Sequence, residues 1–214
     1  MCSHYEAPGA DRLREVYGTS PDQQFKLDLW PGYVGPFVRL RDKDSLDDSP
    51  SKIDVCVGVF GLLPRWAKDT KLSRRTYNAR SETVAEKNSF KAAWKTGKHA
   101  IVLASAIYEP DWRSGKAVPT RISRKDGGLM GIAGLWESWI DPATRDEVLS
   151  FTMLTVNADS HPLMNQYHRP GDERRMVVVL PNGLHNDWLS AKPEQSMDFM
   201  REYPADRLIA SANS

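Results

Sequence analysis

The sequence has little cysteine and almost no net charge. Its 214 residues include two cysteines, Cys2 and Cys56, which are too few for a disulfide framework or a four-cysteine zinc site. We therefore expect a protein of the reducing cytoplasm. The 29 Lys and Arg residues against 28 Asp and Glu residues give a net charge of +1, which excludes binding of nucleic acid through overall positive charge. Any affinity for DNA must come from a local groove.

Long apolar segments, targeting signals and repeats are also missing. No run is long enough to span a membrane, the start Met-Cys-Ser-His is neither basic nor apolar, and the mean hydropathy is −0.53. We expect a soluble protein without a membrane partner. No repeat, low-complexity tract or linker divides residues 1–214, so a single domain and a monomer are expected.

Motifs for common cofactors are lacking too. No glycine-rich loop of the kind that cradles phosphates is present, and no Cys, His and Asp side chains have the spacing of metal ligands. We therefore expect no nucleotide, no metal and no other cofactor. The hydrophobic fraction of 40% is nonetheless enough for a substantial core.

Apolar patterning predicts a β-rich chain. Segments typical of strands are 36–41, 53–60, 100–108, 118–123, 129–139, 149–156 and 176–180. A hairpin turn is predicted at 125–128, a second turn at 141–143 and a polar loop at 42–51. This pattern predicts an α+β fold, β-rich, with a curled antiparallel sheet or barrel-like core flanked by helices.

Two helices are predicted beside these strands. Thr83 and Glu86 have the spacing of a capping box, and Gly97 is placed to end a helix that begins near Thr83. A short amphipathic helix carrying Trp188 and Leu189 is predicted after residues 181–184.

The cysteine at position 2 is the most informative residue for function. If Met1 is removed, Cys2 carries an α-amine and a thiol on adjacent carbons, with ordinary pKa values of about 8 and about 8.5. An aldehyde can form an imine with the amine and then be captured by sulfur, which closes a five-membered thiazolidine ring. An electropositive setting would enlarge the thiolate fraction. By itself, a cysteine near a terminus is more typical of frayed chain than of a nucleophile.

Basic residues cluster at two places along the chain. The first cluster spans residues 71–80 and includes Arg75 and Arg80, and the second is Arg174 with Arg175. Such clusters are typical of a solvated surface unless other evidence points to nucleic acid.

The rest of the chain contains an ordered set of short motifs. They are Met1-Cys2, Pro31-Gly32, Gly61-Leu-Leu-Pro-Arg-Trp66, Asn78-Ala-Arg-Ser-Glu-Thr83, a strand ending at Glu109, Ala133-Gly-Leu-Trp-Glu-Ser-Trp139, Thr155, and His168 ahead of Arg175-Met176. Each motif alone is unspecific. In this order, over residues 1 to about 190, they resemble the SOS-response-associated peptidase (SRAP) family.

The resemblance implies a role in DNA repair and the SOS response. Members of that family bind single-stranded DNA with an abasic site and form a thiazolidine crosslink between the mature N-terminal cysteine and the ring-opened sugar. They also remove their own initiator methionine, which explains the word peptidase. Their fold is a β-rich α+β domain with a positively charged groove, in agreement with the patterning above.

By the same resemblance, four residues are expected to carry the chemistry. Cys2 is the nucleophile, and Asn78 lies beside it to orient the amine and the sugar hydroxyls. Glu109 is the general acid and base, with a pKa raised by partial burial. His168 helps to stabilise or reverse the crosslink.

Five further residues are expected to contact the DNA. Arg80 matches a phosphate contact, Thr155 a hydroxyl in the same site, and Trp66 an aromatic residue that stacks on bases. Arg75 and Arg175 come from the two basic clusters.

The sequence departs from the family pattern at several points. Ser3-His4 follows Cys2 where the family has Gly-Arg, and an insertion, 169–174, separates His168 from Arg175, which leaves His161 as a reserve candidate. With Met1 retained, the α-amine of Cys2 is blocked. Two alternatives therefore stay open: a non-covalent single-stranded DNA-binding module, and a hydrolase that acts on amides through an N-terminal cysteine.

Overall fold

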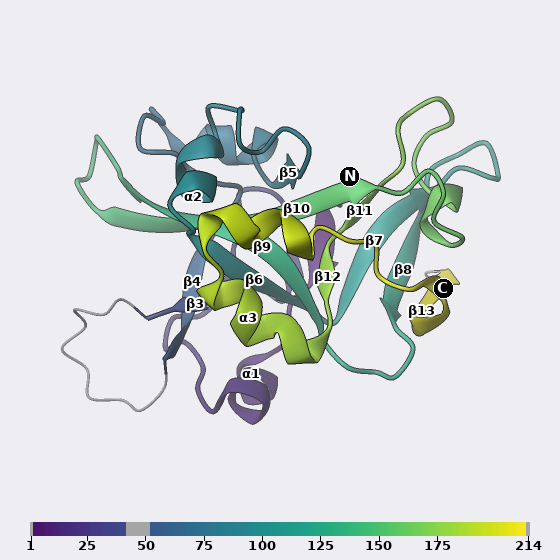
Figure 1. The fold of residues 1–214 in the computed structure, drawn as a ribbon, viewed down its shortest axis with the longest axis horizontal. Helices are drawn as coiled ribbons and strands as arrows, with labels where there is room; N and C mark the ends of the chain where they lie inside the picture. The colour runs from purple at the N-terminus through teal and green to yellow at the C-terminus, as the bar shows by residue number, and fades with distance from the viewer. Residues whose placement is uncertain (1, 42–51, 213–214) are drawn as a thin grey trace.

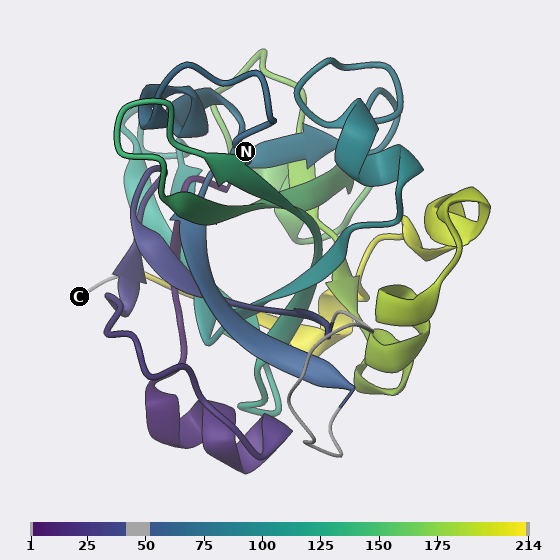
Figure 2. The ribbon, with the colours of Figure 1, turned by 90° about the vertical axis from the view of Figure 1, so that its left-hand side faces the viewer.

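Five long strands close into a barrel. The computed structural model describes residues 2–41 and 52–212. In it, β3 (Val34–Leu40), β4 (Ile53–Phe60), β6 (His99–Ala104), β9 (Met130–Ile140) and β10 (Glu147–Asn157) pair in the order β10-β4-β3-β6-β9. Strand β9 also pairs with β10, which completes the ring seen in Figure 2. Every pair in this ring is antiparallel except β4 with β10.

Aromatic side chains and one close backbone approach shape the barrel. Phe37, Phe60 and Phe151 come from three different strands, are fully buried and pack ring against ring. A Cβ atom at Gly134 of β9 would lie 2.4 Å from the carbonyl oxygen of Thr152 on β10. The two strands therefore approach so closely that only glycine fits at position 134.

Three short strands extend the barrel wall around β10 and β9. Strand β5 (Asn78–Arg80) runs parallel to β10, β11 (Arg175–Val177) runs antiparallel to β10, and β12 (Val179–Leu180) pairs with β9. Thr155 of β10 lies between Arg80 of β5 and Val177 of β11. Residues from three distant parts of the sequence thus meet at one end of β10.

A second sheet of five strands stands beside the barrel. Its order is β13 (Leu208–Ala212), β8 (Val118–Arg124), β7 (Ala106–Asp111), β1 (His4–Glu6) and β2 (Asp28–Leu29). Only Ser105 separates β6 of the barrel from β7 of the sheet, so the chain passes directly from one to the other. Strand β1, near the start of the chain, pairs with β7 in this sheet, whose strands β7, β8 and β13 are seen in Figure 1.

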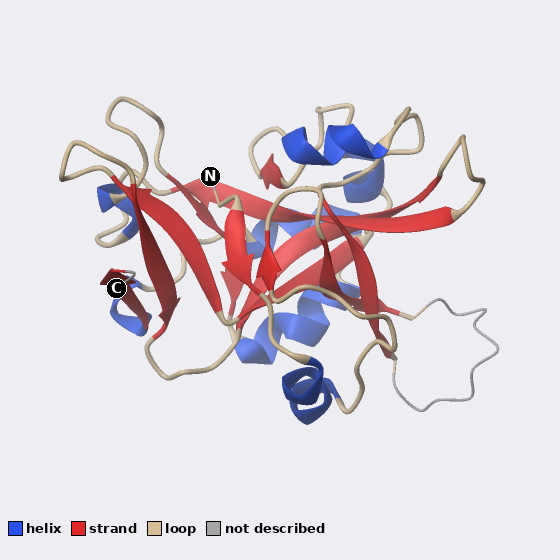
Figure 3. Ribbon diagram, turned by 180° about the vertical axis from the view of Figure 1, so that it is seen from behind, coloured by secondary structure: helices blue, strands red, loops and turns tan. Residues whose placement is uncertain are grey.

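Helices cover the outside of the strands (Figure 3). They are α1 (Ala10–Tyr17), α2 (Lys91–Lys95), α3 (His185–Ser190) and the short 3-10 helices η1 (Thr70–Arg75), η2 (Met164–Gln166), η3 (Asn182–Leu184), η4 (Pro193–Phe199) and η5 (Ala205–Arg207). The indole N–H of Trp188 donates to the carbonyl oxygen of Ala100 at 2.8 Å and so fixes α3 to β6. Among the described residues, no helix is long and apolar enough to cross a membrane.

The predicted fold class is confirmed, and each predicted strand is present. Two of them are interrupted: 100–108 is divided at Ser105, and 176–180 is divided at Val178. At Val178 the chain changes partners, because its N–H donates to Leu154 of β10 while its carbonyl accepts from Ala133 of β9. The short helix after residue 181 is also confirmed as α3.

Two local predictions are wrong, and a third lies outside the described residues. The helix expected from Thr83 begins only at Lys91, since residues 81–90 form successive turns; Asn88 and Ser89 favour turns over helix. The turn at 125–128 is not a hairpin, because β8 pairs with β7 and β13 whereas β9 pairs with β6, β10 and β12. The polar loop at 42–51 lies outside the described part of the chain.

Candidate active site

Cys2 lies where the barrel meets the five-stranded sheet. Its side chain is only 1% exposed, and its Sγ is 3.5 Å from the carbonyl oxygen of His4. The Asn78 Nδ2 atom on β5 donates a hydrogen bond of 2.6 Å to the Cys2 carbonyl oxygen. The start of the chain is therefore anchored to the barrel wall and is not a frayed terminus.

The second polar atom of the Asn78 side chain, Oδ1, also lies beside Cys2. This atom is buried and has no hydrogen-bond partner among the residues that the structure describes. Since the amide nitrogen must face the Cys2 carbonyl, the oxygen is the atom left to accept a bond. Asn78 can thus hold Cys2 and accept a hydrogen bond from a second group.

Glu109 and His168 form a buried pair. Glu109 is at the end of β7 and is 1% exposed, and its Oε2 lies 3.2 Å from His168 Nδ1. The His168 Nε2 atom is 2.8 Å from the carbonyl oxygen of Arg175. A carbonyl only accepts, so Nε2 carries a hydrogen. The Nδ1 atom of the same ring faces the Glu109 carboxyl group, so the two side chains form a buried carboxyl–imidazole pair.

The backbone fixes this pair in place. The His168 N–H donates to Pro110 at 3.0 Å, and Tyr167 forms a bridge to Asp111, so the loop before β11 is tied to the end of β7. His168 has a φ of 73°, in the left-handed region that few residues other than glycine adopt. Such conformations cost roughly 1–3 kcal/mol and cluster at functional sites.

Burial controls the protonation of the site. Loss of solvent raises the pKa of the Glu109 carboxyl above 4.5, although the positive charge of a protonated His168 acts in the opposite direction. Burial also raises the pKa of the Cys2 thiol, and the nearby Glu109 carboxylate raises it further. The electropositive setting that would enlarge the thiolate fraction is therefore not found, and the thiol stays protonated.

Arg175 is buried and surrounded by acceptors. Its guanidinium donates two parallel bonds to the Glu82 carboxylate, at 2.7 and 2.8 Å, and a third of 2.8 Å to Glu173. It also donates to the carbonyl oxygen of Thr155 at 2.8 Å and to the Thr155 hydroxyl at 3.2 Å. These bonds lower the pKa values of Glu82 and Glu173. Arg175 thus holds β10, β11 and the turn after β5 together, rather than lying on the surface.

Arg80 and Thr155 lie next to this cluster but differ in exposure. The side chain of Arg80 is 48% exposed, and its Nη1 is 2.7 Å from Glu173. The Thr155 side chain is buried, and its hydroxyl lies 3.4 Å from the carbonyl oxygen of Ala79. Of the two, only Arg80 can reach a ligand at the surface without a rearrangement.

Trp66 and Arg75 lie on exposed segments outside the buried cluster. Trp66 is 57% exposed, and its indole nitrogen lies 3.4 Å from the carbonyl oxygen of Asn88. It lines a cavity of about 420 Å³ together with Arg65 and Lys91. Arg75 is exposed at the end of η1.

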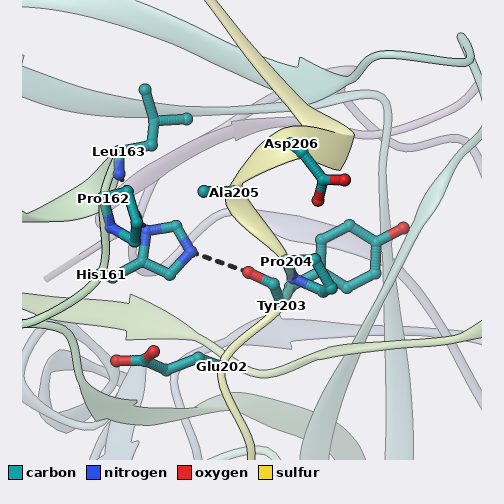
Figure 4. A pocket seen from close by; sticks show the side chains of 8 residues that line it. All are labelled: His161, Pro162, Leu163, Glu202, Tyr203, Pro204, Ala205 and Asp206. Carbon is teal, nitrogen blue, oxygen red and sulfur yellow. Dashed lines mark hydrogen bonds between the residues drawn. The ribbon is translucent and has the colours of Figure 1, made fainter.

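The reserve candidate His161 has a different environment. It is buried, its Nδ1 accepts the backbone N–H groups of Leu163 and Met164, and its Nε2 is 2.7 Å from the carbonyl oxygen of Tyr203 (Figure 4). It lines a cavity of about 650 Å³ with residues 202–206. His161 therefore fastens the segment before β13 to η2, while His168 is the histidine beside Glu109.

Two tyrosines near Cys2 were missed by sequence reasoning. Burial raises the pKa of Tyr77, and electrostatic interaction with Cys2 and Glu109 raises it further, so the phenol lies within electrostatic range of both. Tyr5 is fully buried, and its pKa is raised by burial and by charge on Cys2. The only signal in the sequence is position, since Tyr77 precedes Asn78 and Tyr5 follows Cys2 by three residues.

The site therefore combines a nucleophile, an amide that holds it and a buried acid–base pair. Within residues 2–41 and 52–212, no three His, Cys, Asp or Glu side chains group as ligands of a metal ion. A thiol, a carboxyl group and an imidazole in one buried place are the chemical groups that nucleophilic attack and proton transfer require.

Comparison with known families identifies the class of protein. Residues 1–212 match the sequence model of the family described as SOS response associated peptidase (SRAP). The chain belongs to this family.

The curated relatives cover part of the chain. Abasic site processing protein YoaM from Bacillus subtilis is 31% identical over 157 residues, which are 71% of this chain and 64% of that protein. Abasic site processing protein HMCES from Gallus gallus is 28% identical over 169 residues, 67% of this chain and 50% of that protein. The chain thus spans less than two thirds of the length of these relatives.

Solved structures match over the whole chain. A protein from Bordetella bronchiseptica superimposes with a TM-score of 0.88 and 42% identity, and the match covers 100% of both chains. A protein from Bacteroides thetaiotaomicron superimposes with a TM-score of 0.81 at 21% identity, over 99% of this chain and 91% of that one. The latter shows the shared fold.

Proposed function

We propose that this protein processes abasic sites in single-stranded DNA by forming a covalent crosslink through Cys2. The observation that carries the proposal is the buried Glu109–His168 pair, which lies within electrostatic range of a cysteine whose carbonyl is held by Asn78. The relatives named abasic site processing proteins support the choice of substrate. The reduced cysteines suit a cytoplasmic protein, and we propose that one chain acts on each abasic site.

The first step we propose is removal of Met1. Water adds to the Met1 carbonyl, the Met1–Cys2 amide bond breaks, and the Cys2 nitrogen takes up a proton. The Asn78 bond to the Cys2 carbonyl holds the scissile region against β5 during this step. A buried carboxyl with a raised pKa, such as Glu109, is suited to supply the proton.

The second step is crosslinking to the ring-opened abasic sugar. The Cys2 amine attacks the C1′ aldehyde, and loss of one water gives an imine. The thiol then adds to the imine carbon, and its proton passes to the nitrogen, so that a thiazolidine ring closes. No oxidant or metal is needed for the atoms and charges to balance.

The raised pKa of the Cys2 thiol is consistent with attack by the amine first and by sulfur second. A thiol with a raised pKa stays neutral, so the amine is the first nucleophile and sulfur enters only when a base removes its proton. Glu109 can give a proton to the ring oxygen of the sugar during ring opening and regain one from the C1′ hydroxyl. It can then protonate the hydroxyl group that leaves as water and afterwards accept the thiol proton. His168 keeps Glu109 oriented, and the Asn78 Oδ1 can accept a bond from the amine.

Exposed basic and aromatic residues supply the DNA contacts in this proposal. Arg80 and Arg75 are exposed and suited to phosphates, and the exposed Trp66 to a base. The guanidinium of Arg175 is already bonded to Glu82, Glu173 and Thr155. We therefore propose that Arg175 holds the strands of the site together and does not contact phosphate.

An SDS gel tests the proposal. Met1-free protein is mixed with a single-stranded oligonucleotide carrying one abasic site, with Cys2→Ala and Met1-retaining protein beside it. A shifted band is expected from the mature protein alone. No band from mature protein that still binds the oligonucleotide would contradict the covalent step and leave a non-covalent binding module. Turnover of small amides without a band would favour an amidohydrolase.

A further inference from the structure

Three aromatic rings form a continuous column on the outer face of the five-stranded sheet. The His4 ring of β1 lies between the rings of Trp30 and Tyr108, with centroid distances of 4.1 and 4.2 Å and interplanar angles of 14° and 12°. His4 and Tyr108 are direct partners in the β1–β7 register, and Trp30 directly follows β2. The column therefore crosses three adjacent strands.

The two ends of the column differ: Tyr108 is half-buried and tied to its neighbours by hydrogen bonds, whereas Trp30 is exposed. At the Tyr108 end, the phenol donates to Glu6, whose carboxylate is bound by Arg121 at 2.9 Å. At the other end, Trp30 is 41% exposed although His4 covers one of its faces. The exposed area of Trp30 must then be its outer face and its edge.

The Trp30 ring is held in a fixed orientation. The carboxylate of Asp28 is bonded to the His4 ring and lies 3.4 Å from the Trp30 indole nitrogen. An aromatic face that is already ordered loses little conformational entropy when another ring stacks on it. The exposed face of Trp30 is thus preorganised for stacking by a fourth aromatic ring.

The charges around Trp30 favour a base over a phosphate at this position. The Asp28 carboxylate lies beside both rings, and its hydrogen bond with the His4 ring lowers the Asp28 pKa. A cation lies near this part of the chain: the Arg74 side chain is exposed, and its Cγ atom is 4.0 Å from the Cβ position of Gly32, two residues after Trp30. An aromatic face with a neighbouring cation is the usual arrangement for binding single-stranded nucleic acid.

The column is close to Cys2. His4 follows Cys2 by two residues of extended chain, which span about 7 Å, and Glu109 directly follows Tyr108. We propose that Trp30 is the stacking platform for a nucleobase beside the abasic nucleotide. This inference rests on the proposed function, which brings the abasic sugar to Cys2, and it assigns the neighbouring base to a particular side chain.

A binding experiment in the Cys2→Ala background tests the platform without the covalent step. Three single-stranded oligonucleotides carry an abasic site with adenines on both sides, or with a tetrahydrofuran residue replacing the adenine on one side or on the other. Stacking on an aromatic side chain accounts for an affinity change of about 5-fold to about 150-fold. We expect removal of the adenine on one side to weaken binding by at least about 5-fold, measured by fluorescence anisotropy.

Substitution of Trp30 shows whether this base contacts the indole. Trp30→Ala should weaken binding of the adenine-flanked oligonucleotide by a similar factor and abolish the difference between adenine and tetrahydrofuran, whereas Trp30→Phe should restore most of it. Tyr33→Ala is the matched control, because Tyr33 is 40% exposed but its ring is covered by Lys26 at 4.3 Å; it should keep the base dependence. Circular dichroism checks that each variant is folded.

The outcomes separate this inference from the proposed function. Equal affinity for all three oligonucleotides, or an undiminished base dependence in Trp30→Ala, would overturn the platform even if protein with Cys2 crosslinks normally. A base dependence that requires Trp30, combined with no crosslink from mature protein, would support the platform and contradict the covalent step.

Discussion

Replacing Glu109 by glutamine should stabilise the protein while removing its activity. The carboxyl is 1% exposed, and burial raises its pKa above the ordinary 4.5. Each unit by which the folded-state pKa is raised costs about 1.4 kcal/mol of stability at a pH where the unfolded chain is ionised. For a domain of this size, that corresponds to roughly 3–6 °C in Tm per unit. A neutral amide avoids this cost, and it can still donate to His168 Nδ1.

Because the pKa of Glu109 is raised in the folded state, the difference in Tm between the variant and the wild type depends on pH. Below pH 4.5 both states of the wild type hold the proton, so Glu109→Gln and wild type should melt alike. As the pH rises, the unfolded state loses its proton before the folded state, and the wild type loses stability relative to the variant. The gain in Tm should therefore appear above pH 4.5, grow, and become constant above the folded-state pKa.

Thermal melts between pH 4 and pH 8, together with the crosslinking gel, measure both effects. Glu137→Gln is the matched control, because Glu137 is also buried but is ion-paired with Lys98; neutralising it should lower the Tm. A Glu109→Gln variant that is less stable than wild type at neutral pH, or equally stable at every pH, would refute the reasoning about this carboxyl.

Three further changes test other parts of the structure. Arg175→Met should lower stability by about 1–3 kcal/mol, because the Thr155 carbonyl and two carboxylates lose their donor; a Tm unchanged from wild type would contradict this. Gly134→Ala should cost about 1–3 kcal/mol in urea unfolding, since its Cβ would meet the backbone of β10; equal midpoints would show that the strands separate freely. Asn78→Ala should slow crosslinking about tenfold through loss of the bond to the Cys2 carbonyl, and an unchanged single-turnover rate would remove Asn78 from the site.

The long strands could be predicted from the sequence, and the short elements could not. Strands such as β4 and β9 carry enough apolar residues to show their period, whereas β1, β2 and β5 have only two or three residues and exist because of distant partners. Helix α1 has one fully buried residue, Leu13, and no side-chain cap at Gly9, so neither periodicity nor capping reveals it. The error at 125–128 has the same origin, since the chain there leaves one sheet for the other.

The residues of the candidate site could be predicted from the sequence, but the contacts between them could not. Motifs pointed to Cys2, Asn78, Glu109 and His168, yet the 3.2 Å approach of Glu109 to His168 depends on a loop that crosses to the end of β7. Arg175 belongs to a basic cluster in the sequence, but its burial follows from its place opposite Asn157 in the β10–β11 register. Such contacts join residues far apart in the chain, so the local sequence around each residue does not predict them.

The most direct test of the account is the intact mass of the product formed by Met1-free protein and an oligonucleotide with one abasic site. Thiazolidine formation at Cys2 predicts a single species whose mass is the sum of protein and oligonucleotide minus one water, stable without a reducing agent and absent with Cys2→Ala. Recovery of the two unmodified components, or an adduct that persists in Cys2→Ala, would contradict thiazolidine formation at Cys2.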